Sequence, residues 1–318
     1  MSKPKILLSR RWPEAVEARL AQSYDVTINE SDRPLGEDAL AAAMRDYDAV
    51  CPTVTDRLPA SVVAQDGMRT RIIGNYGAGV EHIDLDAAKT AGLTVTNTPD
   101  VLTDATADIA MTLLLMATRR AGEGERELRA GEWTGWRPTH LLGRSLSGKV
   151  LGLVGYGRIA RAMAERAQAF GMRIAYHSRS PKDDMPDDAY HADLASLLAV
   201  SDVVSLHAPG GAETHHMIDE AMLARMKREA VLINTGRGTL IDEGALAKAL
   251  RDGVIAAAGL DVFEKEPSVH PDLLALSNVV LLPHLGSATL ETREAMGMKV
   301  ADNLDRFFAG QDVIDRIV

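Results

Sequence analysis

Short apolar runs recur along the 318-residue chain, and each is separated from the next by enough residues for a helix. Strands that alternate with helices in this way are typical of parallel sheets with helical crossovers. A first series of expected strands occupies residues 6–8, 26–28, 49–51, 72–74 and 93–96, and a second occupies residues 150–154, 173–176, 203–206, 231–234, 256–260 and 279–282. Because strands that are apolar throughout are covered on both faces, we predict an α/β protein with two doubly wound parallel sheets.

The segment between the two series has a different pattern. Residues 102–120 predict one long helix, whose middle, residues 109–117, is apolar on nearly every side. Such a helix is buried either in the core of its own chain or against another subunit. Residues 122–148 are polar and contain two tryptophans, so we expect an extended arm rather than a further domain.

Composition excludes several classes of protein. The chain is 46% hydrophobic and 25% charged, which is typical of a globular protein of about two domains. Its 35 basic and 45 acidic residues give a net charge of -10, and without a long basic block we expect no nucleic-acid partner. The longest apolar run is far shorter than the ~20 residues of a membrane-spanning helix, and the amino terminus lacks the apolar core of a secretory signal. With Cys51 as the only cysteine, we expect a cytoplasmic protein that does not enter a membrane.

A glycine-rich turn follows the first strand of the second series. Gly155 and Gly157 stand directly after the apolar run 150–154, and Ala160 lies in the helix expected over residues 158–170. In a dinucleotide-binding turn, the first glycine makes a tight bend, the second lets the backbone approach a pyrophosphate, and the third small residue lets helix and strand pack closely. Glycines also serve ordinary turns, but the strand before and the helix after favour a dinucleotide cofactor.

The next expected strand ends at Ser178 and Arg179, where a dinucleotide-binding fold presents the residue that contacts the ribose. An acid about 20 residues beyond the glycine turn normally binds the ribose 2′-hydroxyl of NAD. Here a hydroxyl and a cation stand in that place, and both suit the 2′-phosphate of NADP. We therefore predict NADP as the preferred cofactor and NAD as a possible one, the alternative being an ordinary polar loop that binds NAD.

Three unlike ionisable residues follow three later strands. Arg237 lies between two glycines after the run 231–234, Glu266 follows the run 256–260, and His284 stands between Pro283 and Leu285 at the end of the last run. Taken singly, each is more often a surface or structural residue. Since the carboxyl ends of parallel strands meet at one edge of a sheet, the three together indicate a ligand site there. We expect no metal site, and we expect loop or packing roles for the remaining candidates His82, His140, His177, His207, His215 and His216.

With these motifs the chain resembles the D-isomer-specific 2-hydroxyacid dehydrogenase family over nearly its whole length. Two earlier runs fit the same family, Asn75-Tyr-Gly-Ala-Gly-Val-Glu-His-Ile-Asp84 and Thr96-Asn-Thr-Pro-Asp100. The resemblance implies a flavodoxin-like substrate domain, residues 1–99 and 286–318. It also implies a Rossmann cofactor domain, residues 100–285, with an active-site cleft between the two.

The family resemblance also implies roles for single residues. Arg237 would bind the substrate carboxylate and orient the carbonyl, His284 would be the general acid and base, and Glu266 would hydrogen-bond His284. Backbone N–H groups of Ala78 and Gly79 would hold the carboxylate from the other domain. The cofactor-binding residues would be Gly155, Tyr156, Gly157, Arg158, Ile159, Ser178, Arg179, Thr235, Asp261, His284 and Gly286.

Within the family, residues 131–138 are similar to the arm of the glyoxylate/hydroxypyruvate reductase branch. That likeness implies a homodimer in which Trp136 reaches the partner's active site and limits substrate size, the alternative being a tryptophan that packs within its own chain. We expect NADPH-preferring reduction of small anionic 2-oxo acids, glyoxylate and hydroxypyruvate, to the D-2-hydroxy acids. A D-lactate-type or phosphoglycerate-type dehydrogenase and a non-catalytic, NAD-sensing corepressor remain alternatives.

Overall fold

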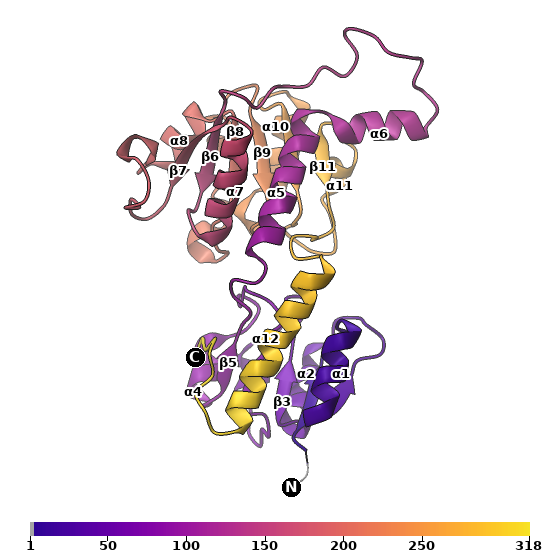
Figure 1. Ribbon diagram of the computed structural model, residues 1–318, viewed down its shortest axis with the longest axis vertical. Helices are drawn as coiled ribbons and strands as arrows, with labels where there is room; N and C mark the ends of the chain where they lie inside the picture. Colours follow the sequence, from indigo (N-terminus) through magenta and orange to yellow (C-terminus); the bar gives the residue numbers. More distant parts are fainter. Residues whose placement is uncertain (1–2) are drawn as a thin grey trace. The chain divides into compact units, whose positions relative to one another are not determined.

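The computed structural model describes residues 3–318, which form two compact units. Unit 1 comprises the chain up to Leu102 together with Ala288–Val318, and unit 2 comprises Thr103–Ser287 (Figure 1). The sequence placed the two boundaries at residues 99 and 285. The structure has them three and two residues later, at 102 and 287.

Unit 1 is built on a five-stranded sheet. Its strands are β1 (Lys5–Leu8), β2 (Asp25–Ile28), β3 (Ala49–Cys51), β4 (Ile72–Gly74) and β5 (Thr94–Thr96). They pair in the order β2-β1-β3-β4-β5, and every pair is parallel. This is the flavodoxin-like strand order. The helices of this unit are α1 (Glu14–Ser23), α2 (Glu37–Asp46), α3 (Ala60–Val63), α4 (Leu85–Thr90) and α12 (Leu290–Phe308).

Alternate side chains of strands β1, β3 and β4 of unit 1 enter two separate cores. Ile6 and Leu8 of β1 pack in one core with Val300 and Leu304 of α12, while Leu7 packs in the other with residues of α2 and α3. All three β1 side chains are almost fully buried. Because both faces are covered, the strand is apolar throughout, which is why it could be found in the sequence.

Unit 2 contains a six-stranded sheet. Its strands are β6 (Val150–Val154), β7 (Arg173–His177), β8 (Val203–Leu206), β9 (Val231–Asn234), β10 (Ala257–Leu260) and β11 (Val279–Leu281). They pair in the order β11-β10-β9-β8-β6-β7, again all parallel. The predicted fold class, two doubly wound parallel sheets, is therefore confirmed. The helices are α5 (Thr103–Thr118), α6 (Ala121–Arg129), α7 (Arg158–Ala169), α8 (Leu194–Val200), α9 (Glu220–Leu223), α10 (Glu243–Arg251) and α11 (Pro271–Leu274), with short 3-10 turns η1 (Asp187–Ala189), η2 (Ala212–Thr214) and η3 (Gly238–Leu240).

The apolar helix α5 lies in the core of its own unit. It packs on strands β9, β10 and β11 and against α7. The approach is close, because a Cβ atom at Gly259 of β10 would lie 2.9 Å from Cβ of Leu113. Leu113 and Leu114 are fully buried. The sequence allowed burial either in the core of the same chain or against another subunit, and the structure shows α5 in the core of its own chain.

The long helix and the arm differ from their predicted bounds. Helix α5 ends at Thr118, Arg120 adopts a left-handed φ of 55°, and a second helix, α6, occupies Ala121–Arg129. The first part of the expected arm is therefore helical. Ion pairs of Arg120 with Glu123 and of Arg129 with Glu125 stabilise this charged, exposed helix, which has no apolar face to reveal it in the sequence. Figure 1 shows α6 and the loop that follows it reaching out from the sheet of unit 2. Among the described residues, no helix is both long enough and apolar enough to cross a membrane.

Candidate active site

The predicted site residues of unit 2 lie at the carboxyl edge of its sheet. Strand β6 leads into Gly155, β9 into Thr235, β10 into Asp261, and β11 into the turn that carries His284. The strand order reverses at β6, which has β7 on one side and β8 on the other. In open α/β sheets, ligands bind at the carboxyl ends of strands beside such a reversal.

The glycine turn has the geometry that a phosphate-binding turn requires. Gly155 has a φ of 84°, and a Cβ atom there would lie 2.8 Å from the carbonyl carbon of His207, so only glycine fits without a shift. Gly157 is exposed, and a Cβ atom there would meet nothing within 4 Å. No side chain caps the amino terminus of α7. Its first N–H groups and the open face at Gly157 therefore fit a pyrophosphate.

The other residues of this turn differ in what they can contribute. The Tyr156 side chain is 8% exposed and packs on Tyr176, with ring centroids 4.6 Å apart, so only its main chain belongs to the turn surface. Arg158 is exposed and Ile159 is partly buried, both in the first turn of α7. Ser178 and Arg179 follow β7; the Ser178 hydroxyl donates to the Ser180 carbonyl, and Arg179 is exposed.

Asn234, at the end of β9, holds the turn that carries Arg237. Its fully buried amide accepts from the Gly236 N–H and donates to the Arg237 carbonyl. This turn leaves Arg237 partly exposed, with Nη1 donating to the Gly236 carbonyl. Thr235 Oγ1 is buried and has no hydrogen-bond partner within the described chain. A buried hydroxyl without a partner is costly, so this atom fits a contact with a bound cofactor.

Glu266 and His284 form a hydrogen-bonded pair. Nδ1 of His284 lies 2.8 Å from Oε2 of Glu266, and the side chains are 37% and 28% exposed. Burial opposes ionisation of Glu266, but the hydrogen bond and charge of His284 outweigh it and hold the pKa of Glu266 below its ordinary value. Glu266 is therefore a carboxylate at neutral pH and can only accept. It follows that Nδ1 of His284 carries a hydrogen, which leaves Nε2 as the atom that can exchange a proton with a ligand.

Asp261 fixes the turn that presents His284. Its carboxylate, 1% exposed, accepts from the N–H groups of Leu285 and Gly286 at 2.7 and 2.8 Å. Burial raises the pKa of Asp261 above its ordinary value, against the effect of these two N–H groups. His284 itself adopts a left-handed φ of 55°, and its N–H donates to the Asp261 carbonyl. Each carboxylate oxygen of Asp261 already accepts one backbone N–H. A contact of Asp261 with a cofactor would therefore use the second lone pair of one of these oxygens.

In unit 1, the expected carboxylate-binding residues lie in the loop after β4. The carbonyl of Gly77 accepts from the Asn75 amide, and the carbonyl of Ala78 accepts from the Asn97 amide. A trans peptide points N–H away from C=O, so the N–H groups of Ala78 and Gly79 face away from these amides. Within the described chain, neither N–H donates to a protein acceptor. Two neighbouring donors of this kind suit an anion.

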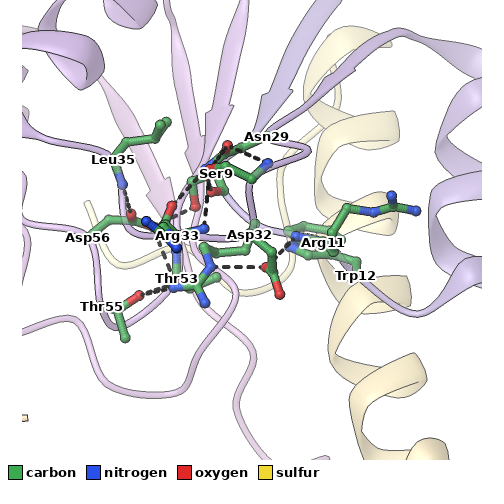
Figure 2. A network of polar contacts seen from close by, with 12 residues as sticks. Ser9, Arg11, Trp12, Asn29, Asp32, Arg33, Leu35, Thr53, Thr55 and Asp56 are labelled. Carbon is green, nitrogen blue, oxygen red and sulfur yellow. Dashed lines mark hydrogen bonds and ion pairs between the residues drawn. The ribbon is translucent and has the colours of Figure 1, made fainter. Parts of the chain in front are cut away.

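A polar network steadies the neighbouring loop of unit 1 (Figure 2). The fully buried Asp56 accepts from the hydroxyls of Ser9 and Thr53 and from the Thr53 N–H. These bonds fix the loop after β3, which carries Val54. Val54 in turn lies against the Ala78 loop, because a Cβ atom at Gly77 would be 2.7 Å from Cγ1 of Val54.

Trp136 lies on the part of the arm that has no helix. Its side chain is 82% exposed, so it does not pack within its own chain as the alternative interpretation expected. Three more apolar side chains on α6 and the arm are exposed, namely Leu128, Trp133 and Leu142.

Sequence reasoning missed the segment 207–210, which follows β8. The carbonyl of His207 lies against Gly155, and a Cβ atom at Gly210 would be 3.1 Å from Cγ of Arg237. The segment thus adjoins both the glycine turn and the arginine turn. The available signal was the run Pro209-Gly-Gly211, which begins three residues after a buried strand of the same sheet.

Two histidines have acidic partners that the sequence did not reveal. His140 Nε2 lies 2.7 Å from Glu127, and His216 Nε2 lies 2.8 Å from Glu264. The sequence does not show these pairs, because the acidic partners are 13 and 48 residues away in the chain. The structure also groups three possible metal-ligating atoms within 4.8 Å of one another, which the sequence did not predict. They are one ring nitrogen of His215, one of His216 and a carboxylate oxygen of Glu264. Because His216 already engages Glu264, we assign no metal to it.

The fold and this edge of the sheet define a dinucleotide-dependent dehydrogenase, and comparison with known proteins agrees. Residues 111–286, more than half of the chain, match the family "D-isomer specific 2-hydroxyacid dehydrogenase, NAD binding domain". The chain therefore belongs to the D-isomer-specific 2-hydroxyacid dehydrogenases and is an NAD(P)-dependent oxidoreductase.

Several proteins similar to this chain over nearly its whole length are named glyoxylate reductases. The chain is 44% identical to a glyoxylate reductase of Thermococcus litoralis, over 97% of this chain and 95% of that protein. It is 45% identical to a glyoxylate reductase of Aeropyrum pernix, over 98% and 95%. Among solved structures, the chain is similar to an NADPH-dependent glyoxylate/hydroxypyruvate reductase from Sinorhizobium meliloti in complex with NADP and malonate. The two superpose with a TM-score of 0.89 at 38% sequence identity, over 100% of this chain and 97% of that one.

Proposed function

We propose that this enzyme reduces small 2-oxo acids, glyoxylate and hydroxypyruvate, to the D-2-hydroxy acids, with NADPH as the preferred hydride donor. The observation that carries the proposal is the Glu266–His284 pair at the carboxyl edge of the sheet that begins with the glycine turn. The names of the relatives support the substrate class.

The nicotinamide cofactor supplies the hydride when it is bound. Arg237 offers a planar guanidinium that can bind the substrate carboxylate through two parallel hydrogen bonds. Binding in this way orients the 2-oxo carbon toward the cofactor. The N–H groups of Ala78 and Gly79 in unit 1 are proposed as further donors to a carboxylate.

His284 completes the reduction by moving one proton. As the carbonyl carbon gains the hydride, negative charge develops on the carbonyl oxygen, and the Nε2–H of His284 donates to that oxygen and then transfers its proton to it. The product is a 2-hydroxy acid, and His284 is left neutral with Nδ1–H still bonded to Glu266. In the oxidative direction, the same Nε2 accepts the hydroxyl proton.

The NADPH preference rests on the end of β7. Within the described chain, residues 177–180 are His, Ser, Arg and Ser, so no acid stands where one would bind a ribose 2′-hydroxyl and repel a phosphate. Arg179 is exposed there and can pair with the 2′-phosphate. The homodimer is proposed from the exposed Trp136, which would complete the partner's substrate pocket.

Steady-state rates with glyoxylate, hydroxypyruvate, pyruvate and phosphohydroxypyruvate, each with NADPH and NADH, test the proposal. We expect the highest kcat/KM for glyoxylate or hydroxypyruvate with NADPH. A preference for pyruvate or the phosphorylated acid would indicate a D-lactate-type or phosphoglycerate-type enzyme instead, and absence of turnover would favour a cofactor-sensing protein. His284→Ala should lower kcat by at least about 10²-fold with little change in NADPH affinity; an active variant would show that the proton donor is another group.

A further inference from the structure

His216 contacts both of the turns that carry the proposed catalytic groups. It lies between η2 and α9, and no step of the proposed reaction uses it. Its N–H donates to the carbonyl of Thr239, 2.8 Å away, and its Nε2 lies 2.8 Å from Oε1 of Glu264. Thr239 is two residues after Arg237, and Glu264 is two residues before Glu266. One residue is thus bonded to the arginine turn through its main chain and to the Glu266 loop through its side chain.

The conformation of His216 is an uncommon one. Its φ is 50°, in the left-handed region that non-glycine residues rarely adopt unless surrounding contacts impose it. The imidazole stacks on that of His215, with ring centroids 3.9 Å apart and an interplanar angle of 29°. The ring is therefore fixed by His215 on its face and by Glu264 at its edge.

The loop that carries Glu266 needs such support. Residues 265, 267 and 268 are exposed and the Glu266 side chain is 28% exposed, so burial alone does not fix the position of this loop. The loop is instead held near Glu264, whose N–H donates to Oε1 of the buried Glu243 at 2.7 Å. It also contacts the arginine turn directly, since a Cβ atom at Gly238 would lie 1.9 Å from the carbonyl carbon of Phe263. The N–H of Phe263 then donates to Glu266 itself.

We propose that His216 is a positioning residue, which, through Thr239 and Glu264, sets the distance between Arg237 and the Glu266–His284 pair. The inference rests on the proposed function, because it concerns how those three groups are held for the reaction. His216 touches neither substrate nor cofactor in this scheme. Its effect on rate is indirect, because displacing a catalytic group by about 1 Å is enough to cost up to 10²-fold in rate.

Two substitutions of His216 separate positioning from folding. His216→Leu keeps side-chain bulk but removes the donor to Glu264, whereas His216→Gln places an amide N–H near the position of Nε2. We expect kcat/KM to fall at least about tenfold in His216→Leu, with a higher KM for the 2-oxo acid, and to recover in His216→Gln. Affinity for NADPH should not change, because the glycine turn lies on another strand. His191→Leu, which removes a partly buried histidine bonded to Ser196, is the matched control and should behave as the unsubstituted enzyme.

The dependence of kcat/KM on pH separates positioning from stability. A variant that is only less stable would keep the original pH profile. In His216→Leu, the acidic decline of kcat/KM should move to higher pH, because a weaker bond to His284 lowers the pKa of Glu266 less than in the original enzyme. Rates are expressed per bound NADPH, so partial unfolding does not contribute. If His216→Leu fails to fold, Glu264→Gln, which keeps the backbone bond to Glu243, should show the same shift.

The outcomes distinguish this inference from the function on which it depends. If His284→Ala is inactive while His216→Leu and Glu264→Gln keep the rate and the pH profile of the original enzyme, the positioning role is refuted and the function stands. If His284→Ala is active, the proposed reaction itself is wrong. A shifted profile with rescue by His216→Gln supports the inference.

Discussion

Nδ1 of His284 and Oε2 of Glu266 lie 2.8 Å apart, although 18 residues separate them in the chain. The carboxylate binds one ring nitrogen, so the other is free to serve the ligand. The pair also fixes how the site should respond to pH and to substitution of the acid.

Replacing Glu266 with glutamine should lower kcat/KM by about 10²-fold, because the amide can still accept from Nδ1 but carries no charge to stabilise a protonated ring. In the unsubstituted enzyme the pKa of Glu266 is lowered, so its contribution is present above the ordinary glutamate range and is lost as pH falls through the lower, folded-state value. Rate measurements down to that acidic range should show a decline that Glu266→Gln lacks. Equal rates in the two proteins at neutral pH would contradict the assignment.

The two glycines of the nucleotide turn should respond differently to alanine. Gly155→Ala forces a left-handed φ on alanine and a contact with the His207 carbonyl, so it should destabilise the protein by about 1–3 kcal/mol. Gly157→Ala has open space and an ordinary φ of -90°, and should fold normally. Its methyl group should nevertheless weaken NADPH binding at least about tenfold, a cost of roughly 1.4 kcal/mol. Chemical denaturation and fluorescence titration measure the two effects, and unchanged NADPH affinity in Gly157→Ala would place the pyrophosphate elsewhere.

Arg179→Asp should reverse the preference between cofactors. The aspartate can accept from a ribose 2′-hydroxyl and repels a 2′-phosphate, so the ratio of kcat/KM for NADPH over NADH should fall at least about tenfold. Arg228→Asp makes the same charge change at an exposed position away from β7, and should leave the ratio unaltered. If both variants keep the original ratio, Arg179 does not contact the cofactor.

The arm should mediate dimerisation and shape the substrate pocket. Light scattering should give twice the chain mass of 34.2 kDa, and Trp136→Ala should raise kcat/KM for bulkier 2-oxo acids relative to glyoxylate. Leu274→Ala removes a 64% exposed apolar side chain of α11 and serves as the control for general surface effects. A stable, fully active monomer would exclude the role in the partner's site.

Cys51 should report the unfolding of unit 1. The thiol is fully buried, and burial raises its pKa to about 12, so the reactive thiolate is scarce at pH 8. We expect no reaction with a thiol reagent in the native protein and one equivalent after denaturation in guanidinium. Rapid labelling of the native protein would show that β3 opens readily.

The parallel strands could be predicted because both of their faces are buried. β1 and β8 are apolar at almost every position and end at turns, so composition alone marks them. Helix α6 was missed because its charges and two glycines, Gly122 and Gly124, resemble those of a loop; its support comes from ion pairs one turn apart.

The site could be predicted only where a residue type is unusual for its position. A glycine pair after a strand, or a histidine between proline and leucine at a strand end, is conspicuous. Asp56 and Glu243 are ordinary acids in the sequence, and only folding shows that they are buried and bonded to backbone N–H groups. The same holds for His216, whose partners come from two distant turns.

Helix α12 covers a face of the unit 1 sheet that begins with β1, and Val300 and Leu304 share a core with Ile6 and Leu8. All of Thr103–Ser287 is synthesised between these two sets of residues. During translation, the middle of the polypeptide can therefore reach its final form while β1 is shielded on that side by α1 alone. The face of β1 that α12 covers is therefore completed only after all of unit 2 has been synthesised.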